Sequence, residues 1–225
     1  NVKVVQDLLR EVETKQRELH ESHLEILRNQ INPHFLYNTL DSIVWMCKMG
    51  KADEAAEMTS ALAKLFRVGI SRGKKLILVA KEAEHAESYL KIQSMRFKSK
   101  FDYTMDISPE ALACRCNKII LQPFIENSIK HGIIEGEKLH ISVKGRVSEK
   151  DLILTVADDG CGMSAEKLEK IRAGNCETMG IGIKNVDLRI KMCFGEEYGV
   201  FVDSVEDEGT TITLRLPRTT EEKQE

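Results

Sequence analysis

The run Asn32–Asp41 constrains the fold more than any other segment, because it combines a proline, a histidine and a helical pattern of apolar residues. Helical spacing predicts an apolar face made of Leu36, Leu40, Ile43 and Cys47. A second face, about 200° away around the helix, carries His34, Asn38, Asp41 and Trp45. The pattern therefore predicts a helix that presents His34 away from its apolar side.

Pro33 directly precedes this histidine. Inside a helix, a proline removes the hydrogen bond to the carbonyl of Asn29 and crowds that carbonyl. The helix is therefore either kinked beside His34, or it begins there with Asn32 as its cap. An exposed imidazole at such a point is open to three interpretations: a nucleophile, a metal ligand or an ordinary surface residue. Spacing alone favours the ordinary surface residue, and the rest of the chain has to decide.

The composition excludes several classes of protein. The 225 residues suffice for one large or two small domains, and 42% hydrophobic with 31% charged residues is typical of globular proteins. A net charge of −3 gives no basic surface, so we expect no nucleic-acid partner. No apolar run reaches the roughly 20 residues that span a bilayer. The six cysteines form no C-x-x-C pair, and we interpret them as packing or incidental residues of a cytoplasmic protein.

The first 30 residues lack glycine and proline and are dense in charge. A heptad spacing links Val5, Val12, Leu19 and Ile26. The segment is therefore either a solvated surface helix or, as we prefer, a signalling coiled coil. Since the first residue is Asn, we expect the chain to be the cytoplasmic part of a longer protein anchored upstream in the plasma membrane, with no membrane contact of its own.

Residues 31–77 are predicted to form a two-helix hairpin that turns at Gly50. The second helix has an apolar face of Ala55, Met58, Leu62, Leu65 and Gly69. Two such helices cannot bury both apolar faces by themselves. A second copy solves this by completing a four-helix bundle, so the sequence predicts a homodimer.

Residues 78–218 are interpreted as an α+β domain, and 219–225 as a disordered tail. The predicted helices span 80–97, 117–132, 165–172 and 182–192, and the predicted strands span 101–107, 140–147, 152–157, 200–204 and 211–216. A loop over 173–179 could cover a bound nucleotide as a lid.

Four separate patches of this domain suit one chemistry. On the helix Leu121–Gly132, an amide oxygen of Asn127 could bind Mg²⁺ while Lys130 neutralises phosphate. The run Asp158–Gly162 ends an apolar strand, where a carboxylate could accept a hydrogen bond from the amino group of adenine and reject guanine.

The other two patches are richer in glycine. Gly180 and Gly182 precede a helix whose backbone N–H groups could bind phosphate. The turn Gly209–Thr211 could anchor a lid. Each of the four patches alone favours an ordinary helix face or turn, but the occurrence of all four in this order is hard to assign to chance.

In this order the patches resemble the boxes of the GHKL ATP-binding fold, shared by histidine kinases, gyrase, Hsp90 and MutL. Asn127 with Lys130 matches the N box, Asp158–Gly162 the G1 box, and Gly180 with Gly182 the G2 box. Gly209 with Thr210 matches the last box. Together with the run from Asn32 to Asn38, residues 25–217 resemble sensor histidine kinases of the LytS/YesM type.

The resemblance implies an α/β sandwich that binds ATP and Mg²⁺, and a phosphoryl transfer to His34. The phosphoryl group would then pass to an aspartate of a response regulator. Asn127 would bind the metal, Asp158 would recognise adenine, and Asn38 is a further catalytic candidate. The remaining nucleotide-binding candidates are Lys130, His131, Gly160, Gly162, Met163, Gly180, Gly182 and Thr210.

Two departures from the family pattern stand out. Many histidine kinases have an acidic residue after the phosphorylated histidine, where this chain has Phe35, so no general base is assigned. Asn38, one turn on, could orient a water for dephosphorylation of the regulator. Many N boxes also carry Asn or Glu four residues before the metal ligand, where this chain has Pro123; Glu126 is the available substitute, about 100° away around the helix.

Two other functions remain open. A GHKL serine kinase would share the ATP pocket but lack the phosphoacceptor hairpin. A non-catalytic dimeric signalling module would keep the fold without turnover.

Overall fold

The structure of the chain is a computed structural model that describes residues 33–69, 76–98, 100–133, 136–172 and 181–220. The chain divides into two compact units, 1–55 and 56–225. The predicted coiled coil over 1–30, the predicted loop over 173–179 and Gly180 lie outside the described residues, as do the last five residues of the predicted tail. The predicted domain bounds at 30, 77 and 218 stay predictions.

The first unit contains α2 (Pro33–Lys48) and the start of α3 (Ala52–Gly69). The predicted turn at Gly50 is confirmed: its φ of 73° is left-handed, and its N–H donates to the Cys47 carbonyl at 3.1 Å. Lys51 then pairs with Glu54 at 2.7 Å in the first turn of α3. Glycine at this position lets one helix stop and the next begin within a few residues.

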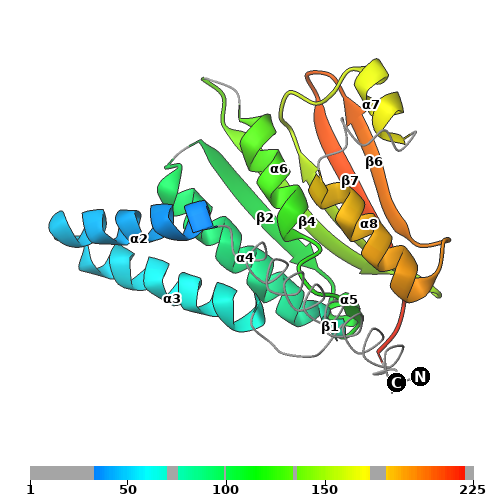
Figure 1. The fold of residues 1–225 in the computed structure, drawn as a ribbon, viewed down its shortest axis with the longest axis horizontal. Helices are drawn as coiled ribbons and strands as arrows, with labels where there is room; N and C mark the ends of the chain where they lie inside the picture. Colours follow the sequence, from blue (N-terminus) through cyan, green and yellow to red (C-terminus); the bar gives the residue numbers. More distant parts are fainter. Residues whose placement is uncertain (1–32, 70–75, 99, 134–135, 173–180, 221–225) are drawn as a thin grey trace, which may run out of the picture. The chain divides into compact units, whose positions relative to one another are not determined.

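The second unit is built on a five-stranded sheet (Figure 1). Its strands are β2 (Phe101–Ile107), β4 (Leu139–Val147), β5 (Asp151–Asp158), β6 (Gly199–Val205) and β7 (Gly209–Pro217). Their order in the sheet is β2-β4-β5-β7-β6. Only β2 and β4 pair in parallel among these strands. A parallel pair needs a crossover connection, and here that connection carries a helix.

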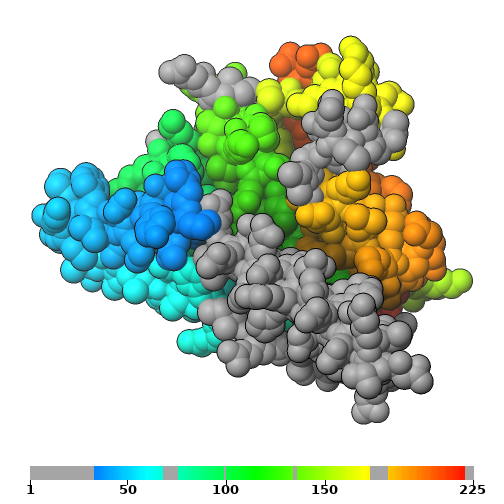
Figure 2. Space-filling model, in the orientation of Figure 1, coloured from blue at the N-terminus to red at the C-terminus, as the bar shows by residue number. Residues whose placement is uncertain are grey.

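One face of the sheet is covered by α4 (Val79–Arg96), α6 (Gln122–Gly132) and α8 (Ile181–Phe194), while α7 (Ala165–Arg172) lies against β6 (Figure 1). In the space-filling view, α6 in green and α8 in gold reach the surface on the same side (Figure 2). Alternate strand residues such as Val143, Leu154 and Leu214 are fully buried under the helices. Their neighbours along each strand are half-buried or exposed, so the sheet has one covered face.

The strands and longer helices of the second unit agree with the prediction to within a few residues, with one exception. The predicted helix over 117–132 is shorter, because residues 115–117 form β3 instead (Arg115–Asn117). This strand pairs antiparallel with β1 (Leu76–Leu78). A short helix α5 (Pro109–Leu112), capped by the Ser108 hydroxyl, was also not predicted. Segments of three or four residues are too short to show a periodic pattern.

The apolar face predicted for α3 is confirmed. Met58 is fully buried, and Ala55, Leu62 and Leu65 are at most 8% exposed. Among the described residues, no helix is long and apolar enough to cross a membrane. The described cysteines are all free thiols; Cys114 and Cys116 are buried, whereas Cys47 and Cys193 are exposed and do not pack in the core.

Candidate functional site

His34 is exposed in the first turn of α2, as its spacing predicted. The Nδ2 atom of Asn38 lies 3.1 Å from Nδ1 and 3.1 Å from Nε2 of the imidazole. A neutral imidazole has one unprotonated nitrogen, and the amide N–H can donate to whichever nitrogen that is. Asn38 therefore restrains the ring from one turn further along the helix.

The buried side of α2 differs from the predicted one. Phe35, Thr39 and Met46 are buried, whereas Leu36 and Ile43 are half-buried and Leu40 is 44% exposed. The buried residues lie roughly 100° around the helix from the predicted apolar face. Apolar residues surround most of this helix, so periodicity alone could not select the buried arc. Several large apolar side chains of α2 stay exposed: Tyr37, Leu40, Val44, Trp45 and Met49.

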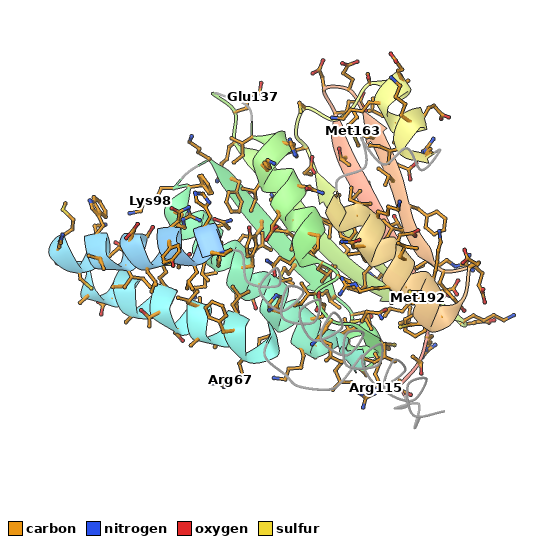
Figure 3. All side chains as sticks on the ribbon, in the orientation of Figure 1. Arg67, Lys98, Arg115, Glu137, Met163 and Met192 are labelled. Carbon is orange, nitrogen blue, oxygen red and sulfur yellow. The ribbon has the colours of Figure 1, made fainter. Side chains whose placement is uncertain are left out.

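The second unit contains a cavity of about 350 Å³ between α6, the end of β5, α7, α8 and the strands β6 and β7. Its polar lining is Asn127, Ser128, His131, Asp158, Cys161, Lys167 and Thr210. Its apolar lining includes Phe124, Met163, Ile171, Ile183, Val202 and Ile212. Met163 lies in the loop that leads from β5 to α7 (Figure 3).

A carboxylate, that of Asp158, is fixed within this cavity. Ser128 on α6 donates its hydroxyl to Asp158 Oδ2 at 2.5 Å, and the backbone N–H of Gly160 donates to Oδ1 at 3.2 Å. Two donors from different elements set the orientation of the carboxylate and leave it capacity to accept a further hydrogen bond from a ligand.

Glycines bring the loop after β5 close to its neighbours. A Cβ atom on Gly160 would lie 2.5 Å from the Cα of Gly132, at the end of α6. Gly162 has a φ of 59°, and a Cβ there would lie 1.9 Å from the carbonyl oxygen of Val205. Side chains other than hydrogen cannot occupy these positions without moving the backbone, so the glycines set the shape of this edge of the cavity.

The start of α6 is fixed by a buried carboxylate. Glu82 on α4 is 0% exposed and accepts three backbone N–H groups, from Ile119, Ile120 and Leu121, at 2.7 to 2.9 Å. Arg189 on α8 donates to the carbonyl oxygens of Lys118 and Ile119 at 3.1 and 2.9 Å. Ile119 has a φ of 55°, a costly conformation for a β-branched residue. These bonds hold it and thereby orient α6.

His131 lies at the far end of α6, where its side chain is largely exposed but partly desolvated and faces two cations. Burial lowers the pKa of the His131 imidazole, and nearby Lys130 and Lys167 lower it further. The Cys161 thiol donates to the His131 carbonyl oxygen at 3.2 Å. The neutral ring is therefore favoured beside the cavity.

Six predicted nucleotide-binding residues line the cavity together: Asn127, His131, Asp158, Gly162, Met163 and Thr210. Lys130 is exposed and is not part of the lining. Gly160 packs on Gly132 just behind it, and Gly182 approaches the Pro123 side chain. The sequence reasoning missed Phe124 and Ser128, although the spacing 124, 127, 128, 131 marks one helix face.

Two protein-family models match this chain. The histidine kinase family model matches residues 22–101, which include His34. The model for histidine kinase-, DNA gyrase B- and HSP90-like ATPases matches residues 118–220, which include the whole cavity lining. The chain belongs to the sensor histidine kinase family. Residues 118–220 of its second unit belong to a GHKL-type ATPase domain, as the boxes in the sequence suggested.

Two relatives illustrate the similarity. The sensor histidine kinase YesM of Bacillus subtilis is 34% identical over 96% of this chain, and the sensor histidine kinase BtsS of Escherichia coli is 30% identical over 94%. The chain spans only 37% and 36% of the length of these histidine kinases. Among solved structures, the catalytic domain of histidine kinase ThkA has the same fold, with a TM-score of 0.51, 17% identity, and coverage of 64% of this chain and 95% of that one.

Proposed function

We propose that the chain is an ATP-dependent protein-histidine kinase that phosphorylates His34 and passes the phosphoryl group to an aspartate of a response regulator. The observation that carries the proposal is the pairing of two features in one chain. One is an exposed histidine held by Asn38, and the other is a cavity with a fixed carboxylate, Asp158.

The cavity suits adenine. Its apolar side chains can contact the faces of a purine ring, and Asp158 can accept a hydrogen bond from the exocyclic amino group. Guanine has a carbonyl at that position and would place an acceptor against the carboxylate. The match to the ATPase family supports ATP as the nucleotide.

Asn127 is the proposed ligand of Mg²⁺. Among the described residues, no cluster of three or more His, Cys, Asp or Glu side chains could hold a metal ion by itself. Mg²⁺ in phosphoryl-transfer sites is commonly held by one or two protein oxygens together with phosphate oxygens. A single amide oxygen in the cavity lining fits that requirement.

The proposed transfer is a displacement at phosphorus. The unprotonated nitrogen of neutral His34 gives its electron pair to the γ-phosphorus, and the bond from phosphorus to the β–γ bridging oxygen breaks, so ADP leaves with that pair. The other ring nitrogen then loses its proton to solvent. An aspartate oxygen of the regulator next forms a bond to phosphorus as the nitrogen–phosphorus bond breaks, and the ring takes up a proton from solvent, which restores neutral His34. Positioning and charge neutralisation supply most of the catalysis in such reactions.

We further propose that the working form is a homodimer. The exposed apolar residues of α2, among them Leu40 and Val44, support a helix face that a second copy would cover. The proposed setting is the cytoplasmic side of the plasma membrane, with an anchor upstream in the full-length protein.

The test is incubation of the chain with γ-labelled ATP and Mg²⁺ beside two variants, His34→Gln and His140→Gln. His140 is a partly exposed histidine on β4 that bonds Asp102 at 2.5 Å, outside the cavity. We expect acid-labile, alkali-stable label in the parent and in His140→Gln, and none in His34→Gln.

Other outcomes would overturn the proposal. Acid-stable label that persists in His34→Gln would favour a GHKL serine kinase. Nucleotide binding without any label would favour a non-catalytic signalling module.

A further inference from the structure

A row of buried polar side chains follows α4 where it faces α6. His85, Tyr89 and Gln93 are spaced four residues apart and therefore share one face of α4. They are 3%, 4% and 6% exposed. Buried polar groups are costly unless their hydrogen bonds are made, so the partners of this row matter.

His85 joins three helices. Its Nδ1 atom lies 3.1 Å from the backbone carbonyl oxygen of Leu65 on α3, and its Nε2 atom lies 2.7 Å from Oε1 of Gln122 on α6. One imidazole thus bridges the second helix of the predicted hairpin and the helix that carries Asn127.

The row continues from Gln122 to Glu126. Gln122 donates its Nε2 hydrogen to Glu126 Oε1 at 2.6 Å. Burial raises the pKa of the Tyr89 hydroxyl, and the neighbouring Glu126, to which Tyr89 is hydrogen-bonded, raises it further. Gln93 in turn donates to the Tyr89 oxygen at 2.6 Å. Glu126 therefore points toward α4 and does not line the cavity, whereas its neighbour Asn127 does.

The two hydrogen-bond partners of His85, on α3 and on α6, depend on the position of one imidazole ring. The Leu65 carbonyl can only accept, so Nδ1 must carry a proton to bond it. Gln122 gives an amide hydrogen to Glu126 and turns its Oε1 atom to Nε2 of His85. A single rigid imidazole therefore contacts an acceptor on α3 and an acceptor on α6 at once, and a displacement of the ring toward one helix lengthens its contact with the other. The contact to α3 and the contact to α6 therefore depend on each other.

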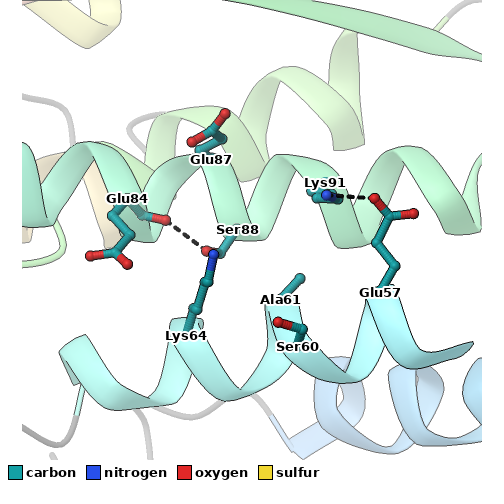
Figure 4. A pocket seen from close by; sticks show the side chains of 8 residues that line it. All are labelled: Glu57, Ser60, Ala61, Lys64, Glu84, Glu87, Ser88 and Lys91. Carbon is teal, nitrogen blue, oxygen red and sulfur yellow. Dashed lines mark hydrogen bonds and ion pairs between the residues drawn. The ribbon is translucent and has the colours of Figure 1, made fainter. Parts of the chain in front are cut away.

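One side of the interface between α3 and α4 is polar and open to solvent. Their interface leaves a groove of about 310 Å³ lined by Glu57, Ser60, Ala61, Lys64, Glu84, Glu87, Ser88 and Lys91 (Figure 4). Glu57 and Lys91 form an ion pair of 2.6 Å across it, and both side chains are more than 40% exposed. Exposed ion pairs add little stability, so the attachment on this side is weak.

We propose that His85 is a positioning residue that couples α3 to the nucleotide pocket. Its bond to the Leu65 backbone is linked, through Gln122 and Glu126, to the turn of α6 that presents Asn127. The inference rests on nucleotide binding in the proposed function. Occupation of the pocket changes the hydrogen bonding at α3, and a shift of α3 changes nucleotide affinity by the same factor, because such coupling is reciprocal.

Two substitutions separate the two bonds. A glutamine amide reaches about as far as Nε2, so His85→Gln keeps the bond to Gln122 and loses the bond to Leu65. An asparagine amide reaches about as far as Nδ1, so His85→Asn does the reverse. His140→Gln is the matched control, because His140 lies on β4 outside both the row and the cavity.

The measurement is amide hydrogen exchange over residues 62–69 of α3, with and without saturating ADP and Mg²⁺. We expect nucleotide to change the exchange rate by about 2-fold or more in the parent chain and in His140→Gln. We expect no change in either His85 variant, although both still bind a fluorescent ADP analogue. Gln122→Met, which interrupts the row without altering His85, should behave like the His85 variants and serves if these do not fold.

The proposal is overturned if hydrogen exchange in α3 does not respond to nucleotide in the parent chain. It is also overturned if exchange in both His85 variants responds to nucleotide as strongly as in the parent chain. Its failure is distinct from failure of the proposed kinase reaction. Coupling without label on His34 refutes the reaction and supports the inference, while the absence of nucleotide binding in the parent refutes both.

Discussion

Ser128 on α6 donates a hydrogen bond of 2.5 Å to the carboxylate of Asp158 at the end of β5. The residue that resembles the adenine-binding aspartate is thus held by the same helix that presents Asn127 to the cavity. A change in the position of α6 would therefore alter the base end and the proposed metal end of the pocket together.

Asp158→Asn is expected to weaken ATP binding by about 10-fold or more, since hydrogen bonds to charged groups are worth about 1.5–3 kcal/mol. Asp159→Asn is the control. The Asp159 carboxylate accepts the backbone N–H of His140 at 2.6 Å and does not line the cavity. Titration of a fluorescent ATP analogue measures both, and an equal loss in the two variants would contradict the role of Asp158.

Asn38→Ala should slow labelling of His34 by about 5-fold, because it removes one hydrogen bond worth about 1 kcal/mol that orients the ring. Asp41→Ala, an exposed change on the same helix, should leave the rate unchanged. Initial rates at saturating ATP check this. The same variant also tests whether Asn38 orients a water in dephosphorylation of the regulator: wild-type rates of both labelling and dephosphorylation would exclude a role for Asn38.

Glu82→Gln should lower the free energy of unfolding by about 3–5 kcal/mol, since it breaks a buried charged arrangement. The Glu82 carboxylate accepts three backbone N–H groups with its two oxygens. A glutamine amide has one oxygen, and its NH₂ group would place a donor against a donor. Glu84→Gln, two residues further on α4, removes an ion pair with Lys81 whose carboxylate side is 39% exposed, and should cost less than about 1 kcal/mol. Urea unfolding distinguishes them; similar losses would mean that Glu82 does not anchor α6.

Gly162→Ala and Gly50→Ala form a matched pair, because both glycines have a left-handed φ. At Gly50 a Cβ would meet nothing within 4 Å, so we expect a cost of about 1–2 kcal/mol from the backbone alone. At Gly162 it would overlap the Val205 carbonyl oxygen, so the cost should be clearly larger and ATP binding should be lost. Unfolding and binding titrations test this. Equal costs would mean that the loop after β5 can move aside.

We expect the free energy of unfolding to depend on pH through His131. Burial, with Lys130 and Lys167, lowers the pKa of its imidazole in the folded chain, whereas the unfolded value is near 6.5. As pH falls below about 6.5, the unfolded chain takes up a proton that the folded chain resists. The free energy of unfolding therefore decreases until the pH reaches the lower pKa of the folded chain. His131→Gln should show a shallower decline between about pH 7 and 5. An unchanged decline would exclude His131 as a source.

The elements that could be predicted from the sequence are those whose apolar residues recur with a regular period. Alternation and helical spacing found the strands of the sheet and the buried side of α3, because each involves a long run of residues with one period. The same reasoning placed the buried side of α2 on Leu36 and Leu40 instead of Phe35, Thr39 and Met46. Apolar residues occupy much of that helix, so contacts with other parts of the chain decide which are covered.

Contacts between distant residues could not be predicted. Glu82 reads as an ordinary charged residue of a helix, and only the fold brings it to the N–H groups of Ile119, Ile120 and Leu121. Ser128 reads as a neutral helix position until β5 places Asp158 against it. The glycines of these motifs act in two ways: Gly162 and Gly209 have a left-handed φ, which is a local property, whereas Gly160 is required by its close approach to the distant Gly132.

Helix α6 is restrained at both ends by segments distant in the sequence. At its start Glu82 and Arg189 bind the backbone of residues 118–121, and at its end Gly132 touches the backbone at Gly160. These contacts at both ends restrict sliding of the helix along its axis. Rotation of α6 about its own axis would turn Glu126 and Asn127 together, because they project about 100° apart on one helix. A rotation that carries Glu126 from α4 toward the pocket would therefore move Asn127 out of the pocket on the side away from α4.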